Sequence, residues 1–334
     1  MKLPHISSEA KHLPVMIDEV LKICTPKNGG TFMDCTFGAG GYSKELLKFP
    51  KTSVVAFDRD NHVTGIAERL KKKFRSRFIF HNKRFSKLDF DSTNKFDAVI
   101  FDLGLSSIQL DDLSRGFSFK SKNELDMSMG QSERSAKTVI NSYGSQDLKD
   151  IIKTFGDEKE ASKIAKNIIK ERASMPIQTT DQLVKIIKNS KKKNYKKIDE
   201  STKTFQAIRI FVNQEISELI EGITKASKIL KPGGKLVVIS FHSIEDKIVK
   251  FFFKHFSKNH SRSNKYLPEN IKNLYLFEDY KNKIIKATSN EVKSNPRSRS
   301  AKLRFAVRSE DVFYDPEELR IKFKYLTDLE KRIA

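Results

Sequence analysis

The stretch TFMDCTFGAGGYS, residues 31–43, decides the fold of this chain. A short apolar run typical of a strand comes first, and Gly38, Gly40 and Gly41 follow before a helical pattern begins. Glycines in such a turn let a ligand approach the backbone, and the N-terminus of the next helix offers unpaired N–H groups. The stretch therefore predicts a strand, a glycine turn and a helix around a nucleotide-like ligand.

The glycine turn lacks the third glycine of the dinucleotide fingerprint, because Ser43 stands at that position. The next strand-like run, residues 53–57 (SVVAF), ends at Asp58. Asp58 follows Gly41 at close to the ~20-residue spacing at which α/β nucleotide folds place a carboxylate on a ribose hydroxyl. Asp58 could instead cap the next helix. With the glycine turn upstream, we favour the ribose role.

Two more strand-like runs follow in this part of the chain. The run over residues 77–80 leads to a loop containing Phe85, and the run over residues 96–101 (FDAVIF) delivers Asp102. Loops that leave the carboxyl ends of strands build the ligand crevice of a doubly wound sheet. Phe85 could stack on an aromatic ring there or belong to the core. The alternation of strands and helices predicts an α/β fold with a parallel sheet.

Residues 110–203 break this alternation, because helical segments follow one another without a convincing strand. We expect an inserted helical domain here, with residues 1–109 and 204–334 forming one discontinuous domain. The insertion ends in a lysine run near Tyr195. This run could bind phosphates, although a solvated loop is the commoner explanation of a lysine cluster.

The α/β pattern resumes after the insertion. We expect one long helix over residues 204–230, a Lys-Pro-Gly-Gly break and a strand over residues 235–240 (KLVVIS). The segment FHSIED and another helix come next, and a final strand follows the basic string NPRSRS within residues 295–307. We therefore expect the first and last thirds of the chain to form one domain that the insertion splits.

Charge and composition point to a polyanionic partner. The 334 residues carry a net charge of +22, and a field of this sign attracts phosphate backbones. Nucleic acid is the obvious candidate. The chain is also rich in Lys, Ile, Asn and Phe and has no Trp, so a compositional bias of its genome is the alternative source of the charge.

No segment suggests a membrane or an oxidising compartment. The apolar runs are no longer than a strand, and the N-terminus lacks the apolar core of a signal peptide. The two cysteines, Cys24 and Cys35, form neither a C-x-x-C pair nor a zinc spacing. We expect a cytoplasmic protein without a disulfide framework or a metal site.

The ordered motifs resemble those of class I S-adenosylmethionine-dependent methyltransferases, which have a Rossmann-like doubly wound sheet. The set comprises the glycine turn, an acid closing strand two, an acid closing strand four and a Pro-Gly-Gly turn before strand five. In that fold the glycine turn accommodates the methionine part of the cofactor, and the strand-two acid holds its ribose. A nicotinamide dehydrogenase needs the third glycine, which this chain lacks.

A closer resemblance covers nearly the whole length. The strings HLPVMIDEV, DCTFGAGGYS, FDRD, DLGLSSIQLDD, RGFSF, LDMSM, TFQAIRIFVNQE, LKPGGKLVVISFHSIEDKIVK and NPRSRSAKLR look like the MraW-type enzymes. This bacterial family methylates the exocyclic N4 of a cytosine in 16S ribosomal RNA. The resemblance implies S-adenosylmethionine as cofactor, ribosomal RNA as partner, and a cofactor site lined by Gly40, Gly41, Tyr42, Asp58, Phe85, Asp102 and Gln109. The family usually carries His where this chain has Tyr42.

Asp102 is the candidate catalytic residue. Methyl transfer is an in-line displacement, so holding the amine and the methyl carbon in line lowers most of the barrier. A nearby acceptor would favour the reacting geometry of the cytosine amine and receive its proton. A purely cofactor-binding role for Asp102 stays open. The secondary candidates are Ser106, Ser107, Ser240 and His242.

The cysteines favour a nitrogen as the methylated atom. Methylation of cytosine C5 needs a covalent adduct with a nucleophile such as cysteine near the end of strand four. Neither Cys24 nor Cys35 lies there in the sequence, and N-methylation needs no such adduct.

For RNA contact we expect the basic cluster Arg297, Arg299, Lys302 and Arg304, together with the lysines of the insertion. Phe117, Phe119 and Phe241 could stack on the target base or pack in the core. The alternatives are a methyltransferase that acts on DNA or protein, and a ribosome-assembly factor that uses the fold mainly for binding.

Overall fold

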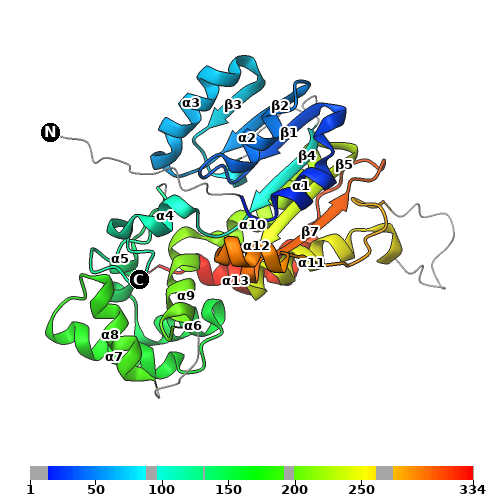
Figure 1. Ribbon diagram of the computed structural model, residues 1–334. Coiled ribbons are helices and arrows are strands. Elements are labelled where there is room, and N and C mark those ends of the chain that lie inside the picture. The colour runs from blue at the N-terminus through cyan, green and yellow to red at the C-terminus, as the bar shows by residue number, and fades with distance from the viewer. Residues whose placement is uncertain (1–13, 88–95, 131, 192–198, 261–273, 334) are drawn as a thin grey trace, which may run out of the picture.

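The computed structural model describes residues 14–87, 96–130, 132–191, 199–260 and 274–333 of the chain. Figure 1 shows a twisted sheet with helices packed along it and a separate group of helices at the lower left. The chain enters this group after β4 and returns from it to β5. The loop after β4 is therefore where the two parts meet.

In the described part of the chain, seven strands form one sheet in the order β3-β2-β1-β4-β5-β7-β6. Neighbours among β1 to β5 run parallel, whereas β7 is antiparallel to both β5 and β6. The strands are β1 (Gly30–Asp34), β2 (Thr52–Phe57), β3 (Phe78–His81), β4 (Phe96–Asp102), β5 (Leu230–Ser240), β6 (Ile285–Lys286) and β7 (Lys302–Val307). The chain reverses its strand order between β1 and β4, and such a switch point binds ligands in α/β sheets. The predicted α/β fold is confirmed.

Alternate strand residues build two buried clusters, because successive side chains of a strand point to opposite faces of the sheet. Phe32 belongs to one cluster, with residues of α1, α2 and α3. Met33 belongs to the other, with residues of α10, α11 and α13. The helices are α1 (Ile17–Cys24), α2 (Gly41–Leu47), α3 (Thr64–Phe74), α10 (Glu215–Ile229), α11 (Ser243–His255) and α13 (Glu317–Glu330). Helices thus cover both faces of the sheet.

Helices α5 to α9 form the group at the lower left of Figure 1. They are α5 (Ala136–Ser142), α6 (Ser145–Gly156), α7 (Ala161–Ser174), α8 (Thr180–Ser190) and α9 (Thr202–Asn213). Their apolar residues join the same buried cluster as the Met33 face of the sheet. The division into domains at residues 110 and 203 stays a prediction. None of the helices in the described residues is both long and apolar enough to cross a membrane.

The single helix expected over residues 204–230 is wrong, because α9 and α10 are separated at Gln214, whose φ is +53°. The preceding Asn213 is buried; its side-chain amide donates to Met127 O at 2.8 Å, and its own carbonyl accepts from Arg59 Nη1 at 2.8 Å. A left-handed residue costs about 1–2 kcal/mol, whereas buried polar groups left without partners cost a similar amount each. Contacts with distant loops therefore decide the break.

Candidate active site

A cavity of about 460 Å³ opens at the carboxyl ends of the parallel strands. The loops that follow β1, β2, β3, β4 and β5 contribute to its wall, as do parts of α9 and α10. Its volume lies in the range of ~300–1,000 Å³ that is usual for small-molecule sites. Of the seven predicted cofactor residues, the cavity is lined by Gly41, Tyr42, Asp58, Phe85, Asp102 and Gln109, and not by Gly40.

Close contacts that exclude side chains shape the glycine turn. Gly38 has a φ of +50° and Gly40 a φ of +74°. A Cβ on Gly40 would lie 2.9 Å from the ring of Phe37, and a Cβ on Gly41 would lie 2.9 Å from Pro14. Gly40 therefore sets the conformation of the turn behind the cavity, whereas Gly41 begins α2 and presents its backbone to the cavity.

Asp58 holds the glycine turn from the loop after β2. Its Oδ2 accepts the Gly38 N–H at 2.7 Å, and its Oδ1 accepts the Asp60 N–H at 2.9 Å. Burial raises the pKa of Asp58 to about 6. The helix-capping role considered from the sequence falls to Asp60, which caps the next turn at His62. Because each carboxylate oxygen has a second lone pair, Asp58 can also accept a hydroxyl from a ligand.

Gln109 lines the cavity, but its side-chain amide is hydrogen-bonded to other residues of the protein. Its Nε2 donates to Asp60 Oδ2 at 2.8 Å, and its Oε1 accepts the Ser106 N–H at 3.0 Å. Arg115 donates to the same Asp60 oxygen at 2.5 Å and to Ser128 O at 2.9 Å. Although burial opposes ionisation, the bonds from Arg115 and Gln109 lower the pKa of Asp60 to about 2. We call Asp60, Gln109 and Arg115 the loop joint, because they tie the cavity loops to the start of the helical part.

Phe85 stands at the cavity wall between β4 and α10. Its ring meets Phe101 edge-on with centroids 5.2 Å apart. A Cβ on Gly222 of α10 would lie 2.5 Å from this ring, so the ring packs directly on the helix backbone. Phe85 is only half-buried. It therefore combines the two roles considered from the sequence, because one side joins the core and another faces the cavity.

Asp102 ends β4 at the cavity wall. Its Oδ1 is buried and has no hydrogen-bond partner among the described residues. Burial raises the pKa of Asp102 to about 8, and the nearby carboxylates of Asp34 and Glu245 add to the effect. A carboxyl with an unpartnered oxygen and a pKa near neutrality is suited to accept a proton.

Tyr42, where the family usually has His, is buried in α2 beside Asp102. Its hydroxyl donates to Val15 O at 2.6 Å. The phenol also interacts with the Asp102 carboxyl beside it, and this interaction partly offsets the rise in the pKa of Asp102. Tyr42 thereby anchors the N-terminal segment against the cavity and contacts the carboxyl of Asp102.

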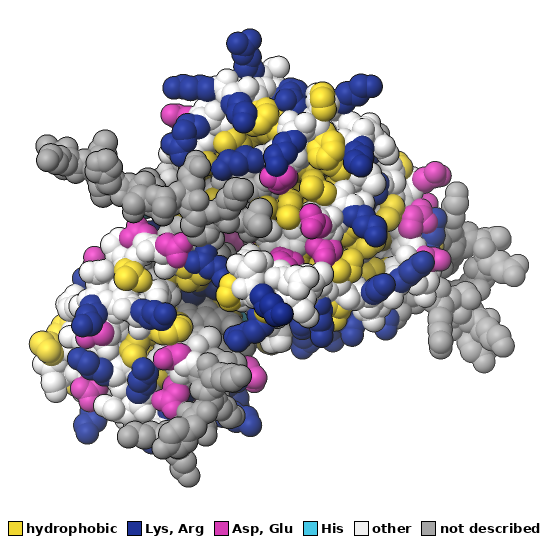
Figure 2. All heavy atoms as spheres, viewed as in Figure 1, with side chains coloured by type: hydrophobic (Ala, Val, Ile, Leu, Met, Phe, Trp, Pro, Cys, Tyr) yellow, Lys and Arg dark blue, Asp and Glu magenta, His cyan; other side chains and the backbone are white. Residues whose placement is uncertain are grey.

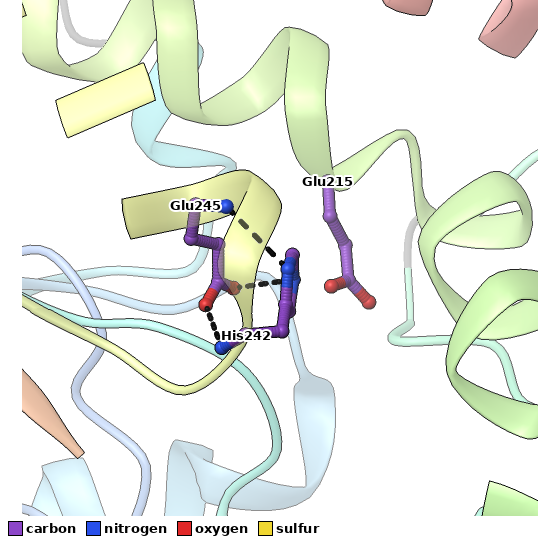
Figure 3. Close-up of side chains that lie close together, drawn as sticks. All are labelled: Glu215, His242 and Glu245. Carbon is purple, nitrogen blue, oxygen red and sulfur yellow. Dashed lines mark hydrogen bonds and ion pairs between the residues drawn. The ribbon is translucent and has the colours of Figure 1, made fainter. Parts of the chain in front are cut away.

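A polar group that was not among the predicted cofactor residues includes the cavity-lining residues Arg209, Glu215 and Glu245. Figure 3 shows Glu215 of α10 beside His242 and Glu245 at the start of α11. Atoms of these three side chains that could bind a metal lie within 4.8 Å of one another. Arg209 of α9 donates to both carboxylate oxygens of Glu215, each at 2.8 Å.

The hydrogen bonds of His242 favour donation over metal binding. Its Nδ1 accepts the Glu245 N–H at 3.4 Å as the cap of α11. A neutral ring that accepts at Nδ1 carries its proton on Nε2, which lies 3.0 Å from Glu245 Oε1. Nε2 then carries the proton and is not a metal ligand, and it forms a close contact with Glu245 without the geometry of a hydrogen bond. We interpret the group as two pairs, Arg209 with Glu215 and His242 with Glu245, that form a polar wall.

The other secondary candidates have structural contacts. Ser106 caps α4 (Ser107–Asp111) in a capping box with Gln109, and Ser107 lines the cavity. Ser240 Oγ donates to Lys302 O at 3.4 Å. Arg209, Glu215 and Glu245 stood inside the quoted strings TFQAIRIFVNQE and FHSIEDKIVK, but their spacing along the chain gave no sign that α9, α10 and α11 meet.

From the sequence we expected neither cysteine to lie near the end of β4, and this prediction is wrong for Cys35. Cys35 is buried at the cavity wall beside the end of β4, because β1 and β4 are adjacent parallel strands. Burial raises the pKa of the Cys35 thiol well above its usual range. The thiolate is the nucleophilic form of cysteine, so this thiol is poorly suited to form a covalent adduct.

The basic cluster predicted for RNA contact is divided by the fold. Arg304 is buried and donates to Asp246 Oδ1 at 2.7 Å, and Lys302 lies 3.1 Å from Oδ2 of the same residue. Arg297, in η7 (Pro296–Ser300), lines the cavity and donates to Asp111 at 2.7 Å. Arg299 in the same turn is exposed. The expectation of one exposed cluster is therefore wrong for Arg304, which stabilises the sheet edge.

The lysine run of the insertion is described only at its start. Lys191 donates to the Glu158 carboxylate and to the Glu200 carbonyl inside the helical group. Tyr195 and the other lysines of the run lie outside the described residues.

Comparison with known proteins identifies the family. The model of the MraW methylase family matches residues 9–309. Curated relatives bear the name Ribosomal RNA small subunit methyltransferase H. The one from Ehrlichia ruminantium (strain Welgevonden) is 43% identical over 302 residues, which cover 88% of this chain and 98% of the relative. The one from Rickettsia bellii (strain RML369-C) is 44% identical over 304 residues, with 88% and 98% covered. The chain therefore belongs to the MraW methylase family, as its motifs predicted.

Proposed function

We propose that this chain methylates the exocyclic N4 of a cytosine in 16S ribosomal RNA, with S-adenosylmethionine as methyl donor. Membership of a methylase family supports the reaction class, and the names of its relatives support ribosomal RNA of the small subunit as substrate. The observation that carries the proposal is Asp102, a half-buried carboxyl at the cavity wall whose enclosed Oδ1 has no hydrogen-bond partner among the described residues. An N-methyltransferase needs such an acceptor for the proton that leaves the amine.

The cavity fits a nucleoside-containing cofactor. Gly41 presents backbone at the turn, where a Cβ would meet Pro14, and Asp58 offers carboxylate lone pairs beside it. Phe85 offers a half-buried ring, and Gln109 completes the wall while it fixes Asp60. S-adenosylmethionine supplies the methyl group when it is bound. These residues bind and orient it, with Asp58 as the partner of its ribose.

Asp102 acts on the amine side of the reaction in this proposal. The Asp102 carboxylate accepts a hydrogen bond from the cytosine amino group, which turns the nitrogen lone pair toward the methyl carbon, and then accepts the proton. Tyr42, whose hydroxyl donates to Val15 O, packs beside this carboxyl and helps to hold it in place. Burial, with smaller contributions from the Asp34 and Glu245 carboxylates, raises the pKa of Asp102 to about 8, so the carboxyl can change its protonation state near neutral pH.

We assign RNA recognition to the helical part within residues 110–203 and to the mouth formed by η7. Arg297 at the cavity edge and exposed Arg299 provide positive charge where RNA would enter. The substrate is the small ribosomal subunit or its precursor, and such a substrate supports the cytoplasm as the compartment.

The test is transfer of a labelled methyl group to small ribosomal subunits, followed by mass analysis of the released nucleosides. We expect N4-methylcytidine. A label on cytosine C5, or acceptance of the label by DNA or protein and not by the subunits, would overturn the proposal. If Asp58→Ala abolishes cofactor binding but preserves subunit assembly in cells, the chain acts mainly as an assembly factor.

A further inference from the structure

Helix α11 carries a row of lysines on its solvent face. Lys247, Lys250 and Lys254 are exposed, and their spacing of three and four residues places them on one side of the helix. Together with Phe251 and His255 they border a shallow depression of about 200 Å³. We call Lys247, Lys250 and Lys254 the α11 lysine row. Figure 2 shows Lys and Arg side chains gathered in the region where Figure 1 places α11 and β7.

The acidic residues of α11 do not neutralise this row. Glu245 is buried and faces His242. Asp246 forms ion pairs with Arg304 Nε at 2.7 Å and with Lys302 Nζ at 3.1 Å. Within the described residues, no ion pair involves a member of the α11 lysine row. The solvent face of α11 therefore keeps a net positive charge.

An aromatic surface accompanies the lysines. The rings of Phe251 and His255 stack with centroids 4.8 Å apart and planes at 13°. His255 is exposed, and Phe251 is half-buried against Phe323 of α13. Lysines for phosphates beside a flat ring for stacking are the combination with which proteins hold single-stranded nucleic acid.

The row begins close to the cavity. Phe241 and Glu245, at the start of α11, line the cavity. From Glu245 to Lys254 the helix advances about 14 Å at ~1.5 Å per residue. A strand of a few nucleotides spans this distance along the helix.

We propose that the α11 lysine row binds the phosphate backbone of the RNA strand that flanks the target cytosine. The identity of this RNA rests on the proposed function. The row adds affinity and orients the strand, and it takes no part in cofactor binding, because it lies on the face of α11 opposite buried Glu245.

The test compares two triple variants that remove equal charge. Lys247→Gln, Lys250→Gln and Lys254→Gln are combined in one protein. The control combines Lys71→Gln, Lys72→Gln and Lys73→Gln, three exposed lysines of α3, which packs on the other face of the sheet beside β3. Binding of purified 16S ribosomal RNA is measured over a series of salt concentrations. A plot of log affinity against log salt falls with salt, and the α11 variant should reduce the steepness of this fall by about 2, at ~0.7 per lost phosphate contact.

The same variant should raise the KM for small subunits at least ~10-fold at moderate salt, leaving kcat and cofactor affinity unchanged. Replacing the three lysines by Arg should retain the wild-type slope. An equal loss of slope in the α3 control, or no loss in the α11 variant, overturns the inference. If the wild type methylates no cytosine in the subunits, the proposed function fails, while the slopes still decide whether α11 binds RNA.

Discussion

Asp102 combines burial, an unpartnered oxygen and a raised pKa, and these properties give a prediction for the reaction. We predict that Asp102→Asn lowers kcat by about 10²-fold or more, the usual contribution of a general base. Because the ionised carboxylate accepts the proton, the wild-type rate should rise with pH and level off above about 8, the pKa of Asp102. The variant should lose this rise. Label transfer to small subunits across a pH series measures both effects.

The control for Asp102 is Asp328→Asn, which removes an exposed carboxylate on α13. It should retain the wild-type pH profile. If Asp102→Asn weakens cofactor binding while kcat and the pH profile persist, Asp102 is a binding residue only. This outcome would decide the alternative that the sequence left open.

At the scale of elements, the loop joint connects the cavity to the helical part through a buried ion pair. Arg115 and Asp60 are 7% and 1% exposed, and Arg115 also holds Ser128. We predict that Arg115→Ala lowers the free energy of unfolding by about 3–5 kcal/mol, because it leaves the Asp60 carboxylate buried without its partner. Urea denaturation measures the change. Arg69→Ala on the exposed face of α3 should cost at most about 0.5 kcal/mol. Similar losses in both variants would contradict a special role for the joint.

Helix α10 is capped by a residue from the end of the chain. Glu330 of α13 is fully buried and accepts the N–H groups of Ile216 and Ser217 at 2.8 Å each. These donors have no partner within their own helix. We predict that Glu330→Ala lowers the free energy of unfolding by about 1–3 kcal/mol, because two buried donors lose their acceptor. A thermal or urea unfolding curve with unchanged stability would rule out this cap as a stabilising contact.

The same residue predicts a pH dependence. Burial raises the pKa of Glu330 to about 7 from an ordinary value of 4.5. The folded state therefore favours the protonated form, and this contribution is complete below about pH 4.5 and is lost as the pH rises to about 7. Between these values the stability of the wild type should fall relative to that of Glu330→Ala. If the difference in unfolding free energy between the wild type and Glu330→Ala grew with pH, the raised pKa of Glu330 would be contradicted.

At the scale of the whole molecule, cofactor and RNA should depend on separate surfaces. We predict that Asp58→Ala weakens cofactor affinity more than RNA affinity, because Asp58 faces the glycine turn. Reversing the charge of Arg297 and Arg299 should weaken RNA affinity more than cofactor affinity, because they lie at the mouth and in the exposed turn after it. Cofactor titration and RNA binding at fixed salt measure the partition. Equal effects of each variant on both ligands would refute it.

Local sequence determined much of this protein. Strand-forming runs that alternate with helices, glycines at positive φ and acids after strands two and four are short-range signals. They were sufficient for the α/β fold and for the family. Asp58, Phe85 and Asp102 line the cavity because the carboxyl ends of parallel strands meet at one edge of the sheet.

Tertiary structure decided what depends on contacts between distant segments. The contact between Asn213 and Arg59 accompanies the break in the helix that local propensity favours. The ion pair with Asp246 buries Arg304, which is therefore not part of an exposed basic cluster. The pairing of β1 with β4 brings Cys35 to the cavity. The polar wall likewise needs α9, α10 and α11 to converge. Sequence spacing reports which residues share one element, whereas burial and pairing between elements fix which side chains meet and which of them remain available for chemistry.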